Sequence, residues 1–102
     1  MAFKKDMKES EARIIVYLSN VENPMKNLEK ISLKLNMDYS YCIRILNGLI
    51  SKNILFKHKL GRKSFYDLIN KEIVSKAEEV LSSRVLEELK DSMKQSKLNE
   101  EV

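Results

Sequence analysis

The sequence is short of the residues that build several kinds of site. Its 102 residues include one Cys and one His, so we expect neither an internal disulfide nor a metal centre. Two Gly and one Pro leave little room for the many turns of an all-β fold. No apolar run approaches the roughly 20 residues that span a bilayer, and the first residues lack the apolar stretch of a signal peptide. We therefore expect a cytoplasmic protein without metal or cofactor.

Signatures of catalysis are missing as well. The sequence has no Gly-rich phosphate loop, no second His for base work and no Ser in an elbow motif. The paired carboxylates Glu78-Glu79 and Glu87-Glu88 fall on the solvent-facing part of a helical segment. There they are best explained by solubility and by pairing with Lys and Arg one turn away. We expect no enzyme activity.

One stretch contains no acidic residue at all. Residues 39–66 carry no Asp or Glu, and their six basic residues are Arg44, Lys52, Lys57, Lys59, Arg62 and Lys63. Residues 1–70 hold 13 Lys and Arg against 7 Asp and Glu, whereas residues 71–102 hold 6 against 8. In a chain this rich in Glu, such a gap is typical of a surface that contacts a polyanion.

The same stretch begins with two predicted helices. Leu28, Ile31 and Leu35 recur at helical spacing and predict a short helix with one buried face. Asn36 tolerates a left-handed turn, and Asp38 is a good N-cap for the next helix. That helix, over residues 39–52, buries a stripe formed by Cys42, Leu46 and Leu49. Two short helices joined by a tight turn form a helix-turn-helix.

The elements on either side complete one domain over residues 1–69. Ser10 is a plausible N-cap for a first helix that puts Ile14, Ile15 and Leu18 on one face with Met7. After the second helix of the pair, Asn53 predicts a left-handed helix end. Residues 54–60 and 64–68 then read as the strands of a β-hairpin, joined by the basic turn Gly61-Arg62-Lys63.

Residues 70–102 are predicted to form a dimerisation segment. No Gly or Pro interrupts them, so we expect one long helix from residue 70 to about residue 95 and a loose tail beyond. Its apolar residues form two clusters about 140° apart when placed on a helical wheel. The first cluster would cover the chain's own domain. The second would meet another subunit, and it consists of Val85, Leu86, Leu89 and Met93.

The order of elements resembles the winged helix-turn-helix family, over residues 10 to about 70. The residues that carry the resemblance are the cap Asp38, the stripe Cys42, Leu46 and Leu49, and the strand entry Asn53-Ile54-Leu55. It is nearest to small regulators of the MarR, ArsR and archaeal Lrs14-like kind, in which Val, Gly, and Ser or Thr are more usual at the positions of Cys42, Asn53 and Asp38. The implied fold is α+β, mainly α, with a three-helix core and a β-hairpin wing.

That resemblance implies a homodimeric transcription regulator, a repressor, that binds double-stranded DNA. Helix 39–52 would be the recognition helix in the major groove, and the wing at residues 57–63 would touch flanking phosphate or the minor groove. The implied DNA-binding residues are Tyr39, Ser40, Tyr41, Ile43, Arg44, Asn47, Lys57, Lys59, Arg62 and Lys63.

Several alternatives remain open at the level of sequence. A winged helix can instead be a protein-interaction module that docks on transcription or replication machinery. Tyr41 and Ile43 fit a part-buried position as well as a DNA contact. Cys42 reads as a small core residue, with a redox switch as the minority interpretation, and His58 reads as a surface residue.

Overall fold

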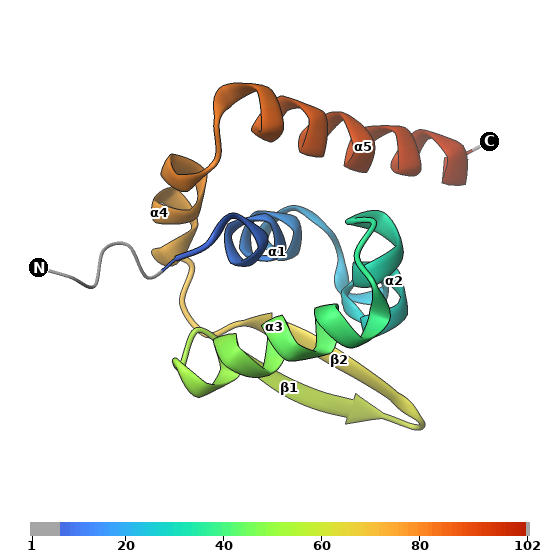
Figure 1. The fold of residues 1–102 in the computed structure, drawn as a ribbon. Coiled ribbons are helices and arrows are strands. Elements are labelled where there is room, and N and C mark those ends of the chain that lie inside the picture. Colours follow the sequence, from blue (N-terminus) through green and yellow to red (C-terminus); the bar gives the residue numbers. More distant parts are fainter. Residues whose placement is uncertain (1–6, 102) are drawn as a thin grey trace, which may run out of the picture.

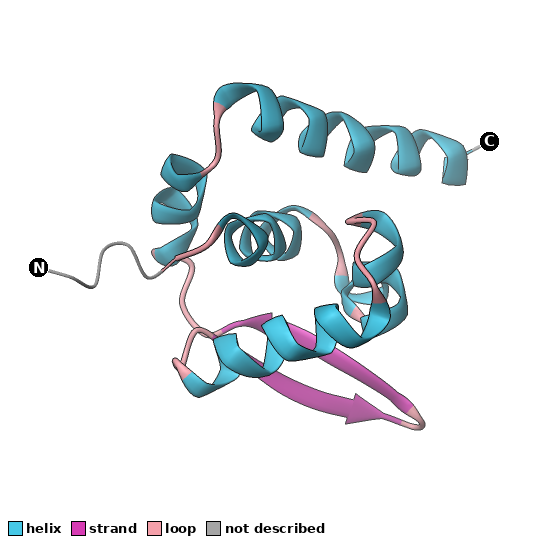
Figure 2. Cartoon of the chain, viewed as in Figure 1, coloured by secondary structure: helices cyan, strands magenta, loops and turns pink. Residues whose placement is uncertain are grey.

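Helix α1 lies at the centre of the molecule, with α3 and the hairpin on one side and α5 on the other (Figure 1). The computed structural model describes residues 7–101, with side chains as far as Met93. Figure 2 shows helices throughout, apart from a single β-hairpin. The elements are α1 (Glu9–Asn20), the 3-10 helix η2 (Asn23–Lys26), α2 (Leu28–Lys34), α3 (Tyr39–Ser51), β1 (Leu55–Leu60), β2 (Lys63–Leu68), α4 (Ile73–Val80) and α5 (Ser83–Glu101).

Helix α1 is buried on nearly every side, because neighbouring elements surround it. From residue 11 to residue 18 only Arg13 keeps substantial exposure. The helix begins earlier than the sequence predicts, since Ser10 lies inside it. Glu11 provides the physical reason: its carboxylate accepts the backbone N–H of Lys8 at 3.0 Å and so satisfies an amide at the helix start.

The helix-turn-helix follows the predicted signals at Asn36, Asp38 and Asn53, and it has one further, unpredicted cap at Asn27. The side chain of Asn27 accepts the backbone N–H of Lys30 at 2.8 Å and caps α2. Asn36 takes the left-handed conformation with φ +55° and turns the chain. Asp38 accepts the backbone N–H of Tyr41 at 3.4 Å and caps α3. After α3 ends, Asn53 has φ +63°, as the sequence predicts.

The wing is an antiparallel pair in which Leu60 faces Lys63. The loop therefore has two residues, Gly61 and Arg62, and Lys63 belongs to the second strand instead of to the turn. Gly61 has φ +64°, which fits a two-residue hairpin loop that begins with glycine. The winged helix-turn-helix and its mainly helical class are confirmed.

The predicted single C-terminal helix is wrong, because the chain breaks between α4 and α5. Leu81 is extended (φ −85°, ψ 141°) and only 5% exposed. The hydroxyl of Ser82 then accepts the backbone N–H of Val85 at 3.3 Å and caps the start of α5. Helix α5 also continues to Glu101, past the loose tail expected from residue 96, because its polar residues are good helix formers. Val102 lies outside the described residues.

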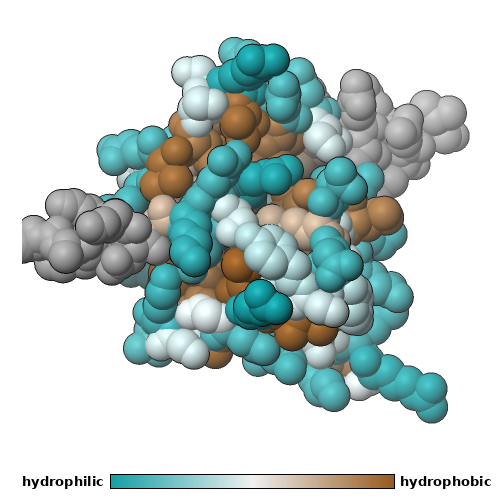
Figure 3. All heavy atoms as spheres, in the orientation of Figure 1, coloured by the Kyte–Doolittle hydropathy of each residue, from teal (hydrophilic) through white to brown (hydrophobic). Residues whose placement is uncertain are grey.

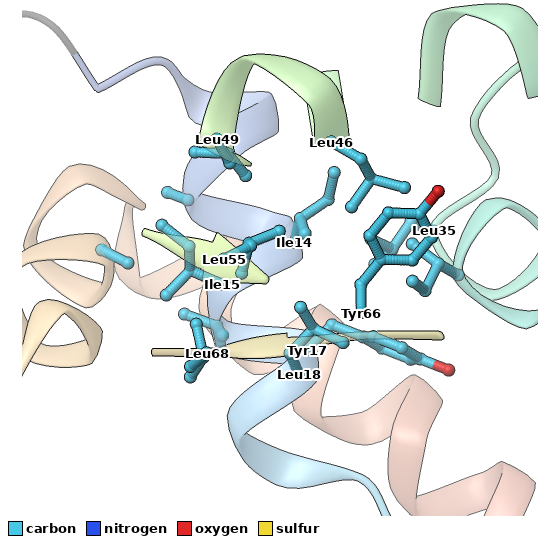
Figure 4. Close-up of a cluster of buried hydrophobic side chains, with 14 of the residues drawn as sticks. Ile14, Ile15, Tyr17, Leu18, Leu35, Leu46, Leu49, Leu55, Tyr66 and Leu68 are labelled. Carbon is cyan, nitrogen blue, oxygen red and sulfur yellow. The ribbon is translucent and has the colours of Figure 1, made fainter. Parts of the chain in front are cut away.

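The core collects apolar side chains from almost every element. Figure 4 shows Leu46 and Leu49 of α3 above Ile14 and Ile15 of α1, with Leu55, Tyr66 and Leu68 of the hairpin close by. Ala77 of α4, Leu81 of the break and Leu89 of α5 join the same cluster. Burying one such Leu or Ile stabilises the fold by about 1.5–3 kcal/mol. Within the described residues, no helix combines the length and apolarity needed to cross a bilayer.

Candidate nucleic-acid interface

The outer face of α3 carries most of the side chains predicted to contact DNA. Because Cys42, Leu46 and Leu49 are fully buried, the residues on the opposite side of the helix point to solvent. Tyr39 is 52% exposed and Tyr41 is 40% exposed. Ser40, Arg44 and Asn47 are also exposed. Ile43 is only half-buried, so less of its surface is available for a thymine methyl group.

The position of α3 is fixed at both ends. Its start is capped by Asp38. Near its end, the ammonium of Lys52 lies 3.0 Å from the carboxylate of Glu11, whose side chain is 8% exposed. A nearly buried carboxylate is stabilised strongly by such a partner. The sequence does not reveal this pair, because Glu11 and Lys52 are 41 residues apart and neither lies in a recognisable motif.

All four predicted wing residues are exposed, on different parts of the hairpin. The strand register puts Lys57 and Lys59 on the same face as the buried Leu55 and Tyr66. Arg62 lies in the loop, and Lys63 begins the second strand on the opposite face.

The loop of the wing comes next to the starts of α2 and α3. Arg62, Lys63 and Tyr39 line one shallow hollow of about 150 Å³, together with Asn27, Leu28, Glu29 and Ser64. Residues far apart in the sequence are thus brought to one surface. It offers a guanidinium, an ammonium and two hydroxyl-bearing side chains, which are the groups that proteins use on phosphate oxygens. The carboxylate of Glu29 marks its edge.

Two acidic residues near this surface, Asp67 and Asp38, are engaged in contacts of their own, whereas Glu29 at the edge of the hollow is exposed. Asp67 receives hydrogen bonds from the ammonium of Lys26 at 2.9 and 3.0 Å. Asp38 is occupied in capping α3. Among the described residues, those from Tyr39 to Tyr66 expose only neutral and basic side chains. We call the outer face of α3, the wing and the hollow between them the basic face.

Cys42 lies directly beneath the basic face and is a core residue. Its thiol is fully buried, and this burial raises its pKa to about 11. Burial also raises the pKa of the Tyr66 hydroxyl, with a smaller effect from Cys42. The thiol therefore stays protonated and weakly nucleophilic near neutral pH. No group of three His, Cys, Asp or Glu side chains suited to a metal ion occurs among the described residues.

The four residues predicted for a dimer interface lie on α5 and contact their own core. Leu89 is 5% exposed, while Val85, Leu86 and Met93 are half-buried and pack against the same cluster. The face of the molecule that Figure 3 shows has some apolar surface between its hydrophilic side chains. The outer parts of the three half-buried side chains are still open to contact. Dimerisation through them stays a prediction.

The fold is that of MarR-family winged-helix regulators. A MepR variant from a multidrug-resistant S. aureus clinical isolate matches with a TM-score of 0.67 at 13% identity, over 97% of this chain and 83% of that one. A complex of S. aureus MepR with DNA matches with a TM-score of 0.64 at 13% identity, over 96% and 73%. A MarR-family regulator from Rhodococcus sp. RHA1 matches with a TM-score of 0.60 at 8% identity, over 88% of this chain and 74% of that one. No family model and no curated protein sequence matches the chain.

Proposed function

We propose that this protein binds double-stranded DNA as a transcription regulator and has no catalytic activity. The observation that carries the proposal is the basic face, where an exposed helix surface and a basic wing meet around a hollow that Arg62 and Lys63 line together with the single carboxylate of Glu29. A solved neighbour with the same fold is a complex with DNA, which supports this choice of polyanion.

In the proposed complex, α3 lies in the major groove and its side chains divide into two roles. Arg44 pairs with guanine, and Asn47 pairs with adenine or with a phosphate. Tyr39, Ser40 and Tyr41 donate hydroxyls to phosphates near the start of α3, where the helix dipole also favours anions. Ile43 contributes a smaller apolar contact with thymine, as its half-buried position allows.

The wing supplies contacts that do not depend on sequence. Lys57, Lys59, Arg62 and Lys63 reach flanking phosphate or the minor groove, and each such contact adds to the salt dependence of binding. Because Arg62 and Lys63 share a hollow with Tyr39, one phosphate group can meet the wing and the start of α3 together.

The proposed regulator acts as a homodimer and represses by covering a promoter. The half-buried residues Val85, Leu86 and Met93 offer apolar surface on α5 for a second copy of the chain. Two recognition helices would then read half-sites about 10 to 20 base pairs apart. Sedimentation of the chain tests this part: a monomer at the concentrations at which duplex binds would contradict it.

Duplex binding across a salt series tests the central proposal, with two matched charge reversals. We expect a steep fall in affinity with salt for the wild type, because several counterions are released. Arg62→Glu with Lys63→Glu should weaken binding by at least tenfold and flatten the salt slope by about 2. Arg84→Glu with Lys90→Glu changes the net charge equally on α5, on the opposite side of the molecule from the wing (Figure 1).

The control pair separates a specific surface from net charge alone. Equal losses in both double variants would mean that overall charge drives the binding, and the wing assignment would be wrong. Weak wild-type binding with a flat salt response would reject DNA as the ligand. The protein-interaction module would then be the better interpretation.

A further inference from the structure

Strand β1 is an open edge of the wing. The sheet has two strands, and β2 occupies one side of β1. On its far side β2 forms one further bridge, between Phe65 and Asn27. Within the described part of the chain, no third strand pairs with the other side of β1. An edge of this kind presents unpaired backbone groups that can accept another strand.

The register shows which backbone groups are free. Beyond the last strand pair, the N–H of Ile69 donates to the carbonyl of Ile54 at 3.0 Å. Residues of an antiparallel strand alternate between hydrogen bonding to the partner and pointing away from it. Counting by twos from Ile54, the residues Phe56, His58 and Leu60 bond to β2. The N–H and C=O groups of Lys57 and Lys59 therefore point outward along the edge.

The side chains of this edge alternate in chemistry. Phe56, His58 and Leu60 lie on the outer face of the hairpin, and Phe56 and Leu60 are 43% and 63% exposed. The ring of His58 lies 5.9 Å from that of Phe56 and 5.7 Å from that of Phe65. Lys57 and Lys59 lie on the other face and are exposed. The free edge is thus apolar on one face and cationic on the other.

We propose that β1 binds an extended peptide segment in which acidic and apolar residues alternate. The backbone of the segment pairs with the outward groups of Lys57 and Lys59, and its side chains set the specificity. Its acidic residues meet the two lysines, while its apolar residues cover Phe56, His58 and Leu60. A second copy of β1 is a poor occupant, because cross-strand pairing would place lysines close to lysines. This inference goes beyond DNA binding and does not depend on it.

Single-stranded nucleic acid is the weaker occupant for the same surface. Its bases need aromatic faces that stand free for stacking. Here the rings of Phe56, His58 and Phe65 pack against one another in a row. A nucleic acid strand would also leave the outward backbone groups of Lys57 and Lys59 without the regular partners that a peptide provides.

The test uses a fluorescent peptide of about eight residues in which Glu and Val alternate, added to the full-length protein. Binding is measured by anisotropy, and its location by amide chemical shifts. One control peptide alternates Lys and Val, and another has the composition of the probe with its Glu residues grouped together. We expect the alternating Glu peptide alone to bind, with the shifts concentrated in residues 55–60.

Two variants at one position separate charge from backbone pairing. Lys59→Thr removes the charge and keeps the N–H, so we expect a loss of a few fold. Lys59→Pro removes the outward N–H as well, and we expect at least tenfold weaker binding than for Lys59→Thr. Neither change touches a hydrogen bond to β2, and thermal unfolding checks that both variants remain folded.

Three results would overturn the proposal. Equal binding of the grouped and alternating Glu peptides would show that the peptide does not bind as an extended strand. Equal affinity of the two Lys59 variants for the peptide would show that the outward N–H of residue 59 does not pair with it. If a single-stranded oligonucleotide bound these residues more tightly than the peptide does, the rings of Phe56, His58 and Phe65 would be a base-stacking site instead. Both proposals use Lys57 and Lys59, so peptide and duplex would compete for these lysines. The duplex salt series is measured without peptide, and failure of the peptide proposal therefore leaves the DNA-binding proposal standing.

Discussion

The helix-turn-helix with its wing and the two C-terminal helices are held in place by different means. Helix α3 has a capped start, a left-handed residue after its end, and an ion pair that ties Lys52 to Glu11. Helix α5 is capped by Ser82 and is held mainly by Leu89 and three half-buried apolar side chains. Hydrogen bonds and ion pairs fix the orientation of a helix, whereas apolar burial is non-directional and permits several orientations. The surface proposed to recognise DNA is therefore positioned by directional contacts at both ends of α3 as well as by apolar burial.

The largest expected effect on the free energy of unfolding comes from replacing one leucine in each region by alanine. Leu46 of α3 is fully buried among α1, α2 and the hairpin, while Leu89 of α5 lies at the edge of the core. We expect Leu46→Ala to lower the free energy of unfolding by roughly 4 kcal/mol and Leu89→Ala by roughly 2 kcal/mol, because α5 can settle into the smaller space. Urea denaturation measures both. Equal losses would show that the two regions are packed alike.

The next effect concerns alkaline pH and Cys42. The folded-state pKa of about 11 lies above the ordinary value of 9.0, so the folded state holds the thiol proton more tightly than the unfolded state. The contribution of Cys42 to the free energy of unfolding should be constant below pH 9 and fall as the pH rises through 11, by about 3 kcal/mol at most. Tyr66, whose pKa is also raised by burial, adds a loss of the same sign.

Denaturation at several pH values checks this expectation, with Cys42→Ala as the comparison. The variant should be less stable at neutral pH, because it leaves a small cavity. Its stability should nevertheless decline less steeply above pH 9, because the part of the decline due to Cys42 is absent. The same slope in both proteins would show that Cys42 ionises freely and that its burial is incomplete in solution.

The smallest effects distinguish the two kinds of ion pair. Lys52→Met leaves the nearly buried carboxylate of Glu11 without its cation and should cost about 1–2 kcal/mol. Arg84 and Glu88 are both strongly exposed at 3.7 Å, so Arg84→Met should change stability by less than ~0.5 kcal/mol. Adding Glu11→Gln to Lys52→Met should recover part of the loss. Equal costs for Lys52→Met and Arg84→Met would place Glu11 in contact with water.

Sequence reasoning succeeds where the signals are local. Asn36, Asp38 and Asn53 are short polar residues at the points where a helix begins or ends, and each has the predicted role. The stripe of Cys42, Leu46 and Leu49 has the helical period and is buried as expected. The exposed side chains predicted for the basic face follow directly from that stripe.

Sequence reasoning fails where distant contacts decide the conformation. The break at Leu81 has no Gly or Pro to mark it, and Ser82 is one of several serines that could act as a cap. The burial of Leu81 in the common core and the cap by Ser82 together account for the turn there. The pairs Glu11–Lys52 and Lys26–Asp67 each join residues 41 positions apart, a separation at which no local pattern indicates a contact.

The central position of α1 has a consequence for the order in which the protein is made. Helix α1 is synthesised before the elements that cover it, and α4 begins more than 50 residues after α1 ends. Because translation adds about 5–20 residues per second, several seconds pass between the synthesis of α1 and that of α4. During that interval Ile14, Ile15 and Val16 have no C-terminal helix to shield them. The nascent chain is then most exposed to aggregation and most dependent on chaperones.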